Sequence, residues 1–182
     1  MPDVILDPRL SERLKETYNL QRTPTTVADF VELGRTMIRA TPELRQFMMS
    51  VRAGKAVVGQ TEADRGQSFV SPEGREVRVM CGYDSISTAL LRGEGIVRAS
   101  CFHCKEKMEI EIKGGKIASA SSPSIVFWFG DGPKGIPVCD HLNLFPDRDH
   151  LAAWLRTNPE ELGVAFTLDE AVEFIRGYLR GL

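Results

Sequence analysis

The sequence predicts an α+β fold, in which N-terminal helices are followed by a mostly antiparallel β-sheet core flanked by C-terminal helices. Three observations predict it. Apolar residues recur at helical spacing in residues 1–60, and strand-like alternation dominates the middle of the chain. Helical spacing returns after residue 146, behind signals for helix starts. We expect a helical segment over 1–60 and an α+β core over 61–182, together forming one compact domain.

Length and composition limit the classes of function. The chain has 182 residues, which is enough to bury a core without disulfides. Its net charge of −2 lacks the basic excess of a nucleic-acid-binding protein. No apolar run approaches the roughly 20 residues that cross a bilayer, and the N-terminus does not have the pattern of a secretory signal. We therefore expect a cytoplasmic protein with reduced thiols that binds neither nucleic acid nor membrane.

Three helices are expected in the N-terminal segment. Pro8 opens the first helix, because proline is tolerated in a first turn. Thr26 can cap the second helix, and an apolar stripe at near-helical spacing follows it. The residues of this stripe are Val27, Phe30, Val31, Leu33, Met37 and Ile38. Thr41-Pro42 ends the second helix, and the third carries Leu44, Phe47, Met48 and Val51.

Strands and turns are expected in the middle of the chain. The tetrad Ser71–Gly74 has the signature of a type I turn and lies between two apolar segments, so it predicts a β-hairpin. Gly114-Gly115 predicts a second hairpin, because both central residues of a type I′ turn need positive φ. Residues 96–99 read as a strand, and the apolar and aromatic run 124–129 reads as a central strand.

Further helices are expected after Cys81 and near the C-terminus. The helix after Cys81 should end at Gly93 or Gly95, since glycine commonly terminates helices. Pro146-Asp147 caps a helix that carries Trp154, and residues 163–166 form a short strand. The tetrad T167-L-D-E170 is a capping box that opens the last helix.

All four cysteines lie between residues 81 and 139. Cys81 stands where a strand gives way to a helix, and we expect the helix N-terminus to lower its thiol pKa. Asp84 is one turn further on, so its carboxylate either faces the same site or caps the helix. Cys139 follows a loop rich in glycine and proline, and it is either a small buried residue or a second thiol of that site.

The pair Cys101-x-x-Cys104 gives a different signal. Two cysteines at this spacing form half of a zinc site, which Cys139 with His141, or Cys81, would complete. The pair also fits a redox dithiol or two thiols without a catalytic role. His150 is interpreted as a surface or capping residue of the helix after Asp147.

Several segments together resemble the organomercurial (alkylmercury) lyase family. The segment C81-G-Y-D84-S-I-S-T-A-L-L resembles the family's Cys-x-x-Asp segment at the head of a helix. I96-V-R-A-S-C101 resembles the part in which the family has another cysteine beside a strand. V138-C139-D-H141-L-N-L-F145 is similar to the segment of the second catalytic cysteine. With Trp154 and G163-V-A-F-T-L-D-E-A-V, the resemblance covers about residues 76–178.

The resemblance implies protonolysis of a carbon–mercury bond in mercury detoxification and resistance. The family's catalytic groups map onto Cys81, Cys139 and Asp84. The implied substrate is a small organomercurial, and the products are a hydrocarbon and Hg(II) held by Cys81 and Cys139. No organic cofactor is implied, and small thiols or a mercuric reductase would accept the Hg(II).

Two alternatives follow from the same cysteines. In the first, the chain is a soft-metal or zinc-binding protein on a lyase-like fold that does not cleave carbon–mercury bonds. Its zinc would lie at Cys101 and Cys104, with two more ligands from Cys81, Cys139 and His141. In the second, Cys101 and Cys104 form a thiol–disulfide pair.

Overall fold

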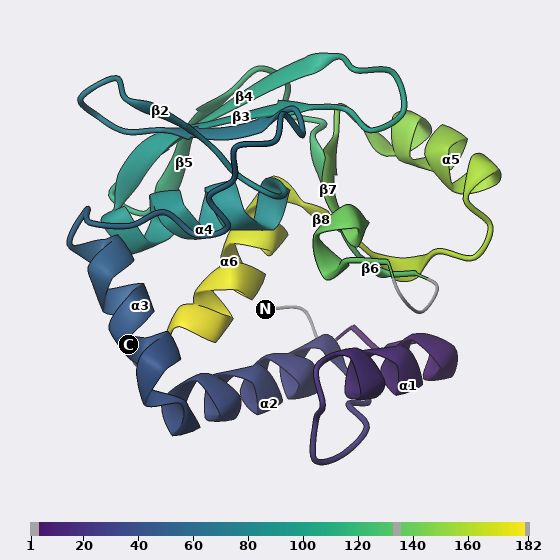
Figure 1. Cartoon of the computed structure of the whole chain (residues 1–182). Helices are drawn as coiled ribbons and strands as arrows, with labels where there is room; N and C mark the ends of the chain where they lie inside the picture. The colour runs from purple at the N-terminus through teal and green to yellow at the C-terminus, as the bar shows by residue number, and fades with distance from the viewer. Residues whose placement is uncertain (1–3, 133–135, 181–182) are drawn as a thin grey trace.

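The computed structural model describes residues 4–132 and 136–180. Its helices lie at both ends of the chain and once in the middle (Figure 1). They are α1 (Pro8–Thr17), α2 (Val27–Ala40), α3 (Pro42–Arg52), α4 (Gly82–Arg92), the 3-10 turn η1 (Val138–His141), α5 (Arg148–Thr157) and α6 (Leu168–Leu179). None of these helices is both long enough and apolar enough to cross a membrane.

The strands of the described residues form two antiparallel sheets. The larger sheet has the order β2-β1-β3-β4-β5 and consists of β1 (Gln67–Val70), β2 (Glu76–Arg78), β3 (Glu94–Ser100), β4 (Lys107–Lys113) and β5 (Lys116–Ala120). The smaller sheet has the order β7-β6-β8 and consists of β6 (Val126–Asp131), β7 (Leu142–Phe145) and β8 (Leu162–Thr167). The predicted α+β class is confirmed, whereas the division into two sheets was not predicted.

The predicted turns lie where the sequence places them. In the β1–β2 hairpin the N–H of Gly74 donates to the carbonyl oxygen of Ser71 at 2.9 Å. Gly114 and Gly115 have φ values of 57° and 68° and join β4 to β5. These left-handed conformations favour glycine, because a side chain there meets the backbone. The strand predicted over 124–129 is observed as β6 over Val126–Asp131, and it is central as predicted, since it pairs with both β7 and β8.

The predicted helix ends are also confirmed. The side chains of Thr26, Asp147 and Thr167 each accept the backbone N–H three residues later, which satisfies a free donor at the helix start. Thr167 completes a capping box with its helix. Pro42 is in the first turn of α3, and Gly93 ends α4 with a φ of 84°. Short-range hydrogen bonding therefore determines most element boundaries.

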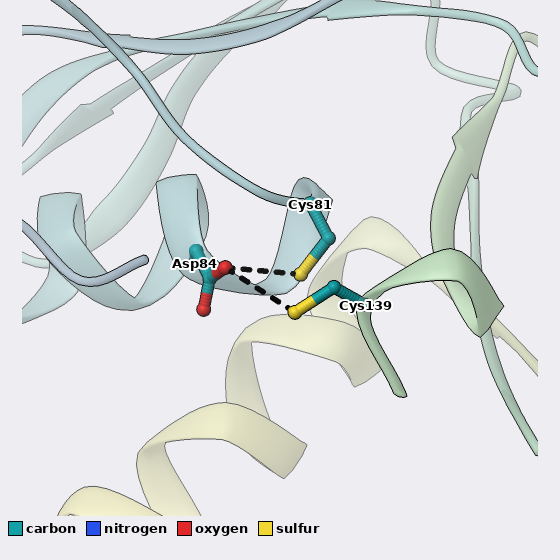
Figure 2. Close-up of side chains that lie close together, drawn as sticks. All are labelled: Cys81, Asp84 and Cys139. Carbon is teal, nitrogen blue, oxygen red and sulfur yellow. Dashed lines mark hydrogen bonds between the residues drawn. The ribbon is translucent and has the colours of Figure 1, made fainter. Parts of the chain in front are cut away.

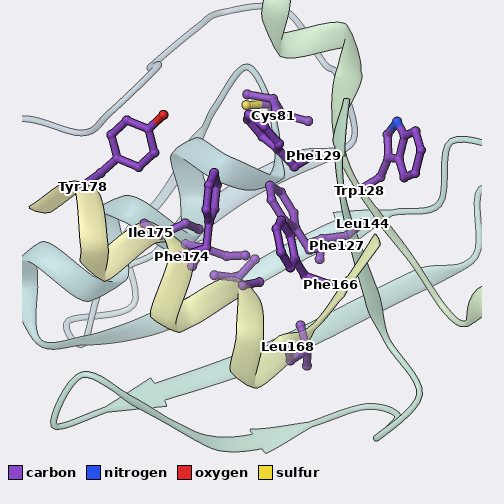
Figure 3. Packing of buried hydrophobic residues seen from close by; sticks show 14 of the residues in the cluster. Cys81, Phe127, Trp128, Phe129, Leu144, Phe166, Leu168, Phe174, Ile175 and Tyr178 are labelled. Carbon is purple, nitrogen blue, oxygen red and sulfur yellow. The ribbon is translucent and has the colours of Figure 1, made fainter. Parts of the chain in front are cut away.

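The core between α6 and the smaller sheet is built from aromatic rings (Figure 3). The ring of Phe174 lies 4.8 Å from that of Phe129 and 5.1 Å from that of Phe166, measured between centroids. Such pairs add about 0.5–1.5 kcal/mol each beyond their burial. Helix α4 packs on α6 and also contacts strands of both sheets. The N-terminus of α4 is therefore held where the main layers meet.

Helix α2 packs closely against α6, and the contact depends on small residues. A side chain at Gly34 would overlap the ring of Tyr178, and one at Gly177 would crowd Val31. The apolar stripes of α2 and α3 were predicted as core. Met37 and Phe47 depart from that prediction, with 39% of each residue exposed, while most other residues of the stripes are buried or half-buried.

Candidate active site

The site begins at the residue that precedes α4. Cys81 is the N-cap of this helix in an extended conformation, with φ of −155° and ψ of 174°. It is completely buried, and Asp84 in the first turn is 7% exposed. Cys139 lies in η1, 55 residues away from Asp84, and is half-buried. The fold therefore brings one buried and one accessible thiol to the same carboxylate.

One oxygen atom joins the three side chains (Figure 2). The Sγ of Cys81 lies 3.3 Å from Oδ2 of Asp84, and the Sγ of Cys139 lies 3.8 Å from the same oxygen. The three ligand atoms all lie within 4.8 Å of one another. Two sulfur atoms at this separation can bind one soft metal ion, with a carboxyl group at hand for proton transfer.

The pKa values of the two thiols move in opposite directions. Burial raises the pKa of Cys81, and the hydrogen bond to Cys139 and the charge of Asp84 raise it further. The pKa of Cys139 is lowered, chiefly because the thiol of Cys81 donates a hydrogen bond to it. The expectation that the helix N-terminus lowers the pKa of Cys81 is therefore wrong, since burial outweighs the helix dipole. Cys139 is therefore the more readily ionised thiol of the pair.

Cys81 is the N-cap of α4, and Asp84 in the first turn faces the two thiols. Its carboxylate accepts hydrogen bonds from the two thiols and from the backbone N–H of Cys81, which is the N-cap residue. Burial nevertheless raises its pKa above the ordinary value of 3.8. A carboxyl group with a raised pKa holds its proton more readily near neutral pH, as a general acid must.

Gly59 is a site residue that sequence reasoning missed. Its φ is 59°, and a Cβ atom there would overlap the carboxylate of Asp84. Its carbonyl oxygen accepts the backbone N–H of Met80 at 2.9 Å. The carboxylate therefore lies directly on the backbone of a left-handed glycine. No motif marks this position, because Gly59 is far from Asp84 in the sequence.

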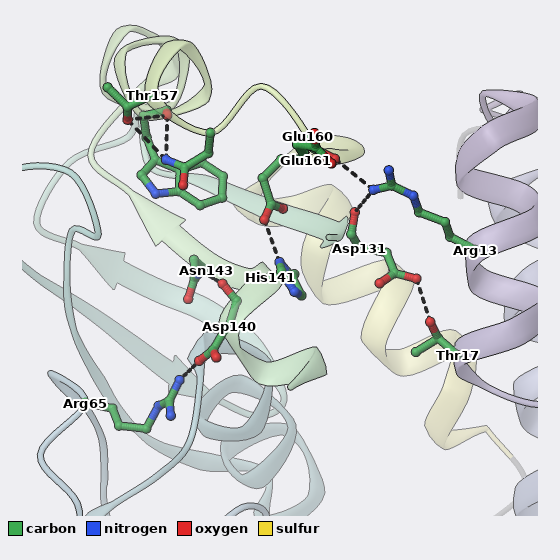
Figure 4. A network of polar contacts seen from close by, with 12 residues as sticks. Arg13, Thr17, Arg65, Asp131, Asp140, His141, Asn143, Thr157, Glu160 and Glu161 are labelled. Carbon is green, nitrogen blue, oxygen red and sulfur yellow. Dashed lines mark hydrogen bonds and ion pairs between the residues drawn. The ribbon is translucent and has the colours of Figure 1, made fainter. Parts of the chain in front are cut away.

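Polar contacts fix the turn that carries Cys139 (Figure 4). Asp140 forms an ion pair with Arg65, and its carbonyl oxygen accepts the side-chain N–H of Asn143 at 2.7 Å. Nδ1 of His141 lies 2.7 Å from Oε1 of Glu161, and both side chains are buried. The residues that follow Cys139 are thus anchored to two other segments, at Arg65 and at Glu161.

Replacing Arg65 by glutamine will raise the pKa of the Cys139 thiol. The positive charge of Arg65 helps to lower this pKa, so its loss disfavours the thiolate. The rate of Cys139 alkylation by iodoacetamide, followed by peptide mapping across pH, will have its midpoint at higher pH. Arg35→Gln is the control, because Arg35 is also partly buried and paired, but with Glu32. An unchanged midpoint in Arg65→Gln would contradict this role.

Two partly buried tyrosines that the sequence did not single out are affected by the charges of the site. Burial raises the pKa of Tyr18, and the charges of Cys81 and Cys139 raise it further. Burial raises the pKa of Tyr83 as well, with a smaller contribution from Asp84 and Cys81. Both phenol groups are therefore held in the neutral form by their buried surroundings. Tyr18 is the C-cap residue of α1.

The predicted zinc ligands are distributed differently from the thiol site. Cys101 is buried and Cys104 is exposed. His141 is engaged with Glu161 through Nδ1. Among the described residues, no group of ligand atoms within 4.8 Å combines either cysteine of this pair with His141.

Known proteins share the fold of this chain. A solved structure described as the mercury-bound form of MerB2 matches with a TM-score of 0.63 and 18% identity, covering 83% of this chain and 96% of that chain. At this identity the match shows a shared fold. No curated protein matches the chain. The model of the alkylmercury lyase family matches residues 41–180, which is most of the sequence. The chain therefore belongs to the alkylmercury lyase family, the enzymes that cleave carbon–mercury bonds.

Proposed function

We propose that this alkylmercury lyase cleaves its substrate by protonolysis, with Cys81, Cys139 and Asp84 as the catalytic residues. The observation that supports this assignment is the shared oxygen atom. Oδ2 of Asp84 lies 3.3 Å from one sulfur and 3.8 Å from the other, although Cys139 is distant in sequence. Mercury held by both sulfurs would therefore place its bond to carbon beside a proton donor.

Cys139 captures the substrate first. It is the more exposed thiol and the one whose pKa is lowered, so it ionises more readily than Cys81. The thiolate binds the mercury of R–Hg–X and displaces the anion X⁻. Hg(II) is a soft ion that prefers thiolate ligands, which gives this step its direction.

Cys81 and Asp84 complete the reaction. As the sulfur of Cys81 binds mercury, its proton passes to the Asp84 carboxylate, the hydrogen-bond acceptor at 3.3 Å. The carboxylic acid then protonates the carbon atom while the electron pair of the carbon–mercury bond goes to carbon. The products are R–H and Hg(II) bound by two thiolates, and Asp84 is a carboxylate again.

Release of Hg(II) requires other thiols. Two small thiol molecules exchange with Cys139 and Cys81, take the metal as a dithiolate complex and return a proton to each protein sulfur. A mercuric reductase with exposed thiols is a second acceptor of the same chemistry. This cycle needs reduced cysteines, which supports a place in the cytoplasm.

Methane release from methylmercury tests the proposed function. Purified protein is incubated with methylmercury and an excess of a small thiol, and methane in the headspace is measured against time. We expect more than one methane molecule per protein molecule, because the thiol removes the Hg(II). Tight mercury binding without methane would contradict the proposal and favour a soft-metal site on a lyase-like fold.

Gly59→Ala will lower methane release far more than Gly54→Ala. Both glycines have left-handed backbones, with φ of 59° and 75°, so alanine costs about 1–2 kcal/mol of strain at each. A Cβ atom at residue 54 has no neighbour within 4 Å, whereas one at residue 59 overlaps Asp84. Thermal unfolding measures the shared strain, and the methane assay measures the displacement of Asp84. Equal activity of the two variants would show that Gly59 does not position the carboxylate.

A further inference from the structure

A second cluster of metal-binding side chains lies outside the group of Cys81, Cys139 and Asp84. The Sγ of Cys104, a carboxylate oxygen of Glu106 and an imidazole nitrogen of His150 all lie within 4.8 Å of one another. The first two belong to the loop between β3 and β4, and the third belongs to the first turn of α5, which lies beside that loop (Figure 1). We propose that these three side chains bind a zinc ion at the protein surface.

The ring of His150 is oriented for this role. Its Nδ1 lies 2.7 Å from Oδ1 of Asp147, and its backbone N–H donates to the same oxygen at 2.9 Å. Nε2 faces Oε2 of Glu106 at 3.7 Å. In the neutral ring, a carboxylate that accepts the Nδ1 proton leaves the lone pair on Nε2. A carboxylate behind a histidine in this way is the usual support of a metal ligand in proteins.

Backbone hydrogen bonds close the loop that carries Cys104 and Glu106. The N–H of Cys101 donates to the carbonyl oxygen of Glu106 at 2.8 Å, and the N–H of Lys105 donates to the carbonyl oxygen of Cys101 at 2.9 Å. Lys105 has a φ of 66°, a conformation that costs a residue with a side chain about 1–2 kcal/mol. A strained residue thus separates Cys104 from Glu106, and strain of this kind is often retained at functional sites.

The donor set favours zinc. Thiolate, imidazole and carboxylate are the three side-chain ligands that Zn²⁺ uses, whereas Ca²⁺ and Mg²⁺ take oxygen ligands. Three protein ligands leave one position of a tetrahedral ion for water. Cys104 and Glu106 are exposed, so water and metal can reach the site. The sequence pointed to zinc at Cys101 and Cys104, whereas this geometry replaces Cys101 with Glu106 and His150.

The proposed ion would connect the two halves of the fold. The β3–β4 loop belongs to the larger sheet, and α5 packs against β6 and β7 of the smaller sheet. A metal that binds the native arrangement and not the unfolded chain raises the melting temperature as its concentration increases. Zinc should therefore stabilise the protein without taking part in carbon–mercury cleavage.

Zinc binding by the reduced full chain tests the proposal in a Cys139→Ser background, which removes one thiol of the catalytic site. Equilibrium competition with a chromophoric chelator will show one bound Zn(II). Cys104→Ser and His150→Gln will each weaken Zn(II) binding by at least about 100-fold. This is the upper limit of the effect of losing a residue that only supports a metal ligand. Co(II) in place of Zn(II) will show a sulfur-to-metal charge-transfer band that Cys104→Ser removes.

His103→Gln is the matched control. The rings of His103 and His150 lie 6.5 Å apart between centroids, but His103 does not belong to the ligand group. Its substitution should leave zinc affinity unchanged. The proposal is overturned if the Cys139→Ser protein binds no Zn(II), if Cys104→Ser or His150→Gln binds it normally, or if His103→Gln loses it.

Discussion

Replacing Asp84 by asparagine will slow methane release from methylmercury by about 10²–10⁴-fold, the usual contribution of a positioned general acid. Asparagine keeps the size of the side chain, so it still fits against the backbone of Gly59. It has no acidic proton to give to carbon. The measurement is the single-turnover rate of methane formation, because this step precedes release of Hg(II).

Two controls separate lost chemistry from lost structure in Asp84→Asn. The variant keeps Cys81 and Cys139, so it should still retain one Hg(II) against dialysis. Its stability should also depend less on pH. The folded-state pKa of Asp84 is raised. The contribution of Asp84 to wild-type stability is therefore fully present below the ordinary carboxyl pKa of 3.8 and is lost as pH rises through the folded value. A variant with wild-type turnover would exclude Asp84 as the proton donor.

Serine at either catalytic cysteine will abolish methane release, but the two variants will stop at different stages. Cys139→Ser lacks the accessible thiolate, so it should not capture methylmercury at the site. Cys81→Ser keeps Cys139 and should form a stable methylmercury adduct without methane. Native mass spectrometry of the protein after brief exposure distinguishes the two outcomes.

These variants are best compared in a Cys104→Ser background, because Cys104 is exposed and would itself bind methylmercury. Cys104 lies outside the catalytic group, so this background should retain full turnover. Identical behaviour of Cys81→Ser and Cys139→Ser would contradict the proposed order of capture and cleavage. If turnover were lost in Cys104→Ser and kept in the other two variants, the assignment of the chemistry to Cys81 and Cys139 would be contradicted.

The parts of the fold that depend on neighbouring residues could be predicted from the sequence. Thr167 with its capping box, Asp147 at the start of α5 and Gly114-Gly115 between β4 and β5 all act within a few residues. The pairing of strands into two separate sheets depends on contacts between distant segments. Local patterns contain no information on that choice, so the sequence indicated antiparallel strands without dividing them.

The candidate site was predicted in identity but not in its electrostatics. The resemblance to the lyase family supplied Cys81, Asp84 and Cys139 together, and the structure brings them within reach of one another. The sequence placed Cys81 at a helix N-terminus and so predicted a lowered pKa. Its complete burial, which reverses that shift, follows from packing by residues far away in the chain. Gly59 could not be found for the same reason.

Helices α1 and α2 lie outside the segment that the family model matches, which begins at residue 41. Yet Tyr18, which follows α1, packs edge-on against Phe30 of α2 with 5.2 Å between the ring centroids, and Phe30 packs against Phe129 of β6. The three residues of the proposed site therefore lie in the matched segment, while part of the aromatic core comes from outside it. Changes in α1 and α2 can therefore alter the packing behind β6 without replacing Cys81, Asp84 or Cys139.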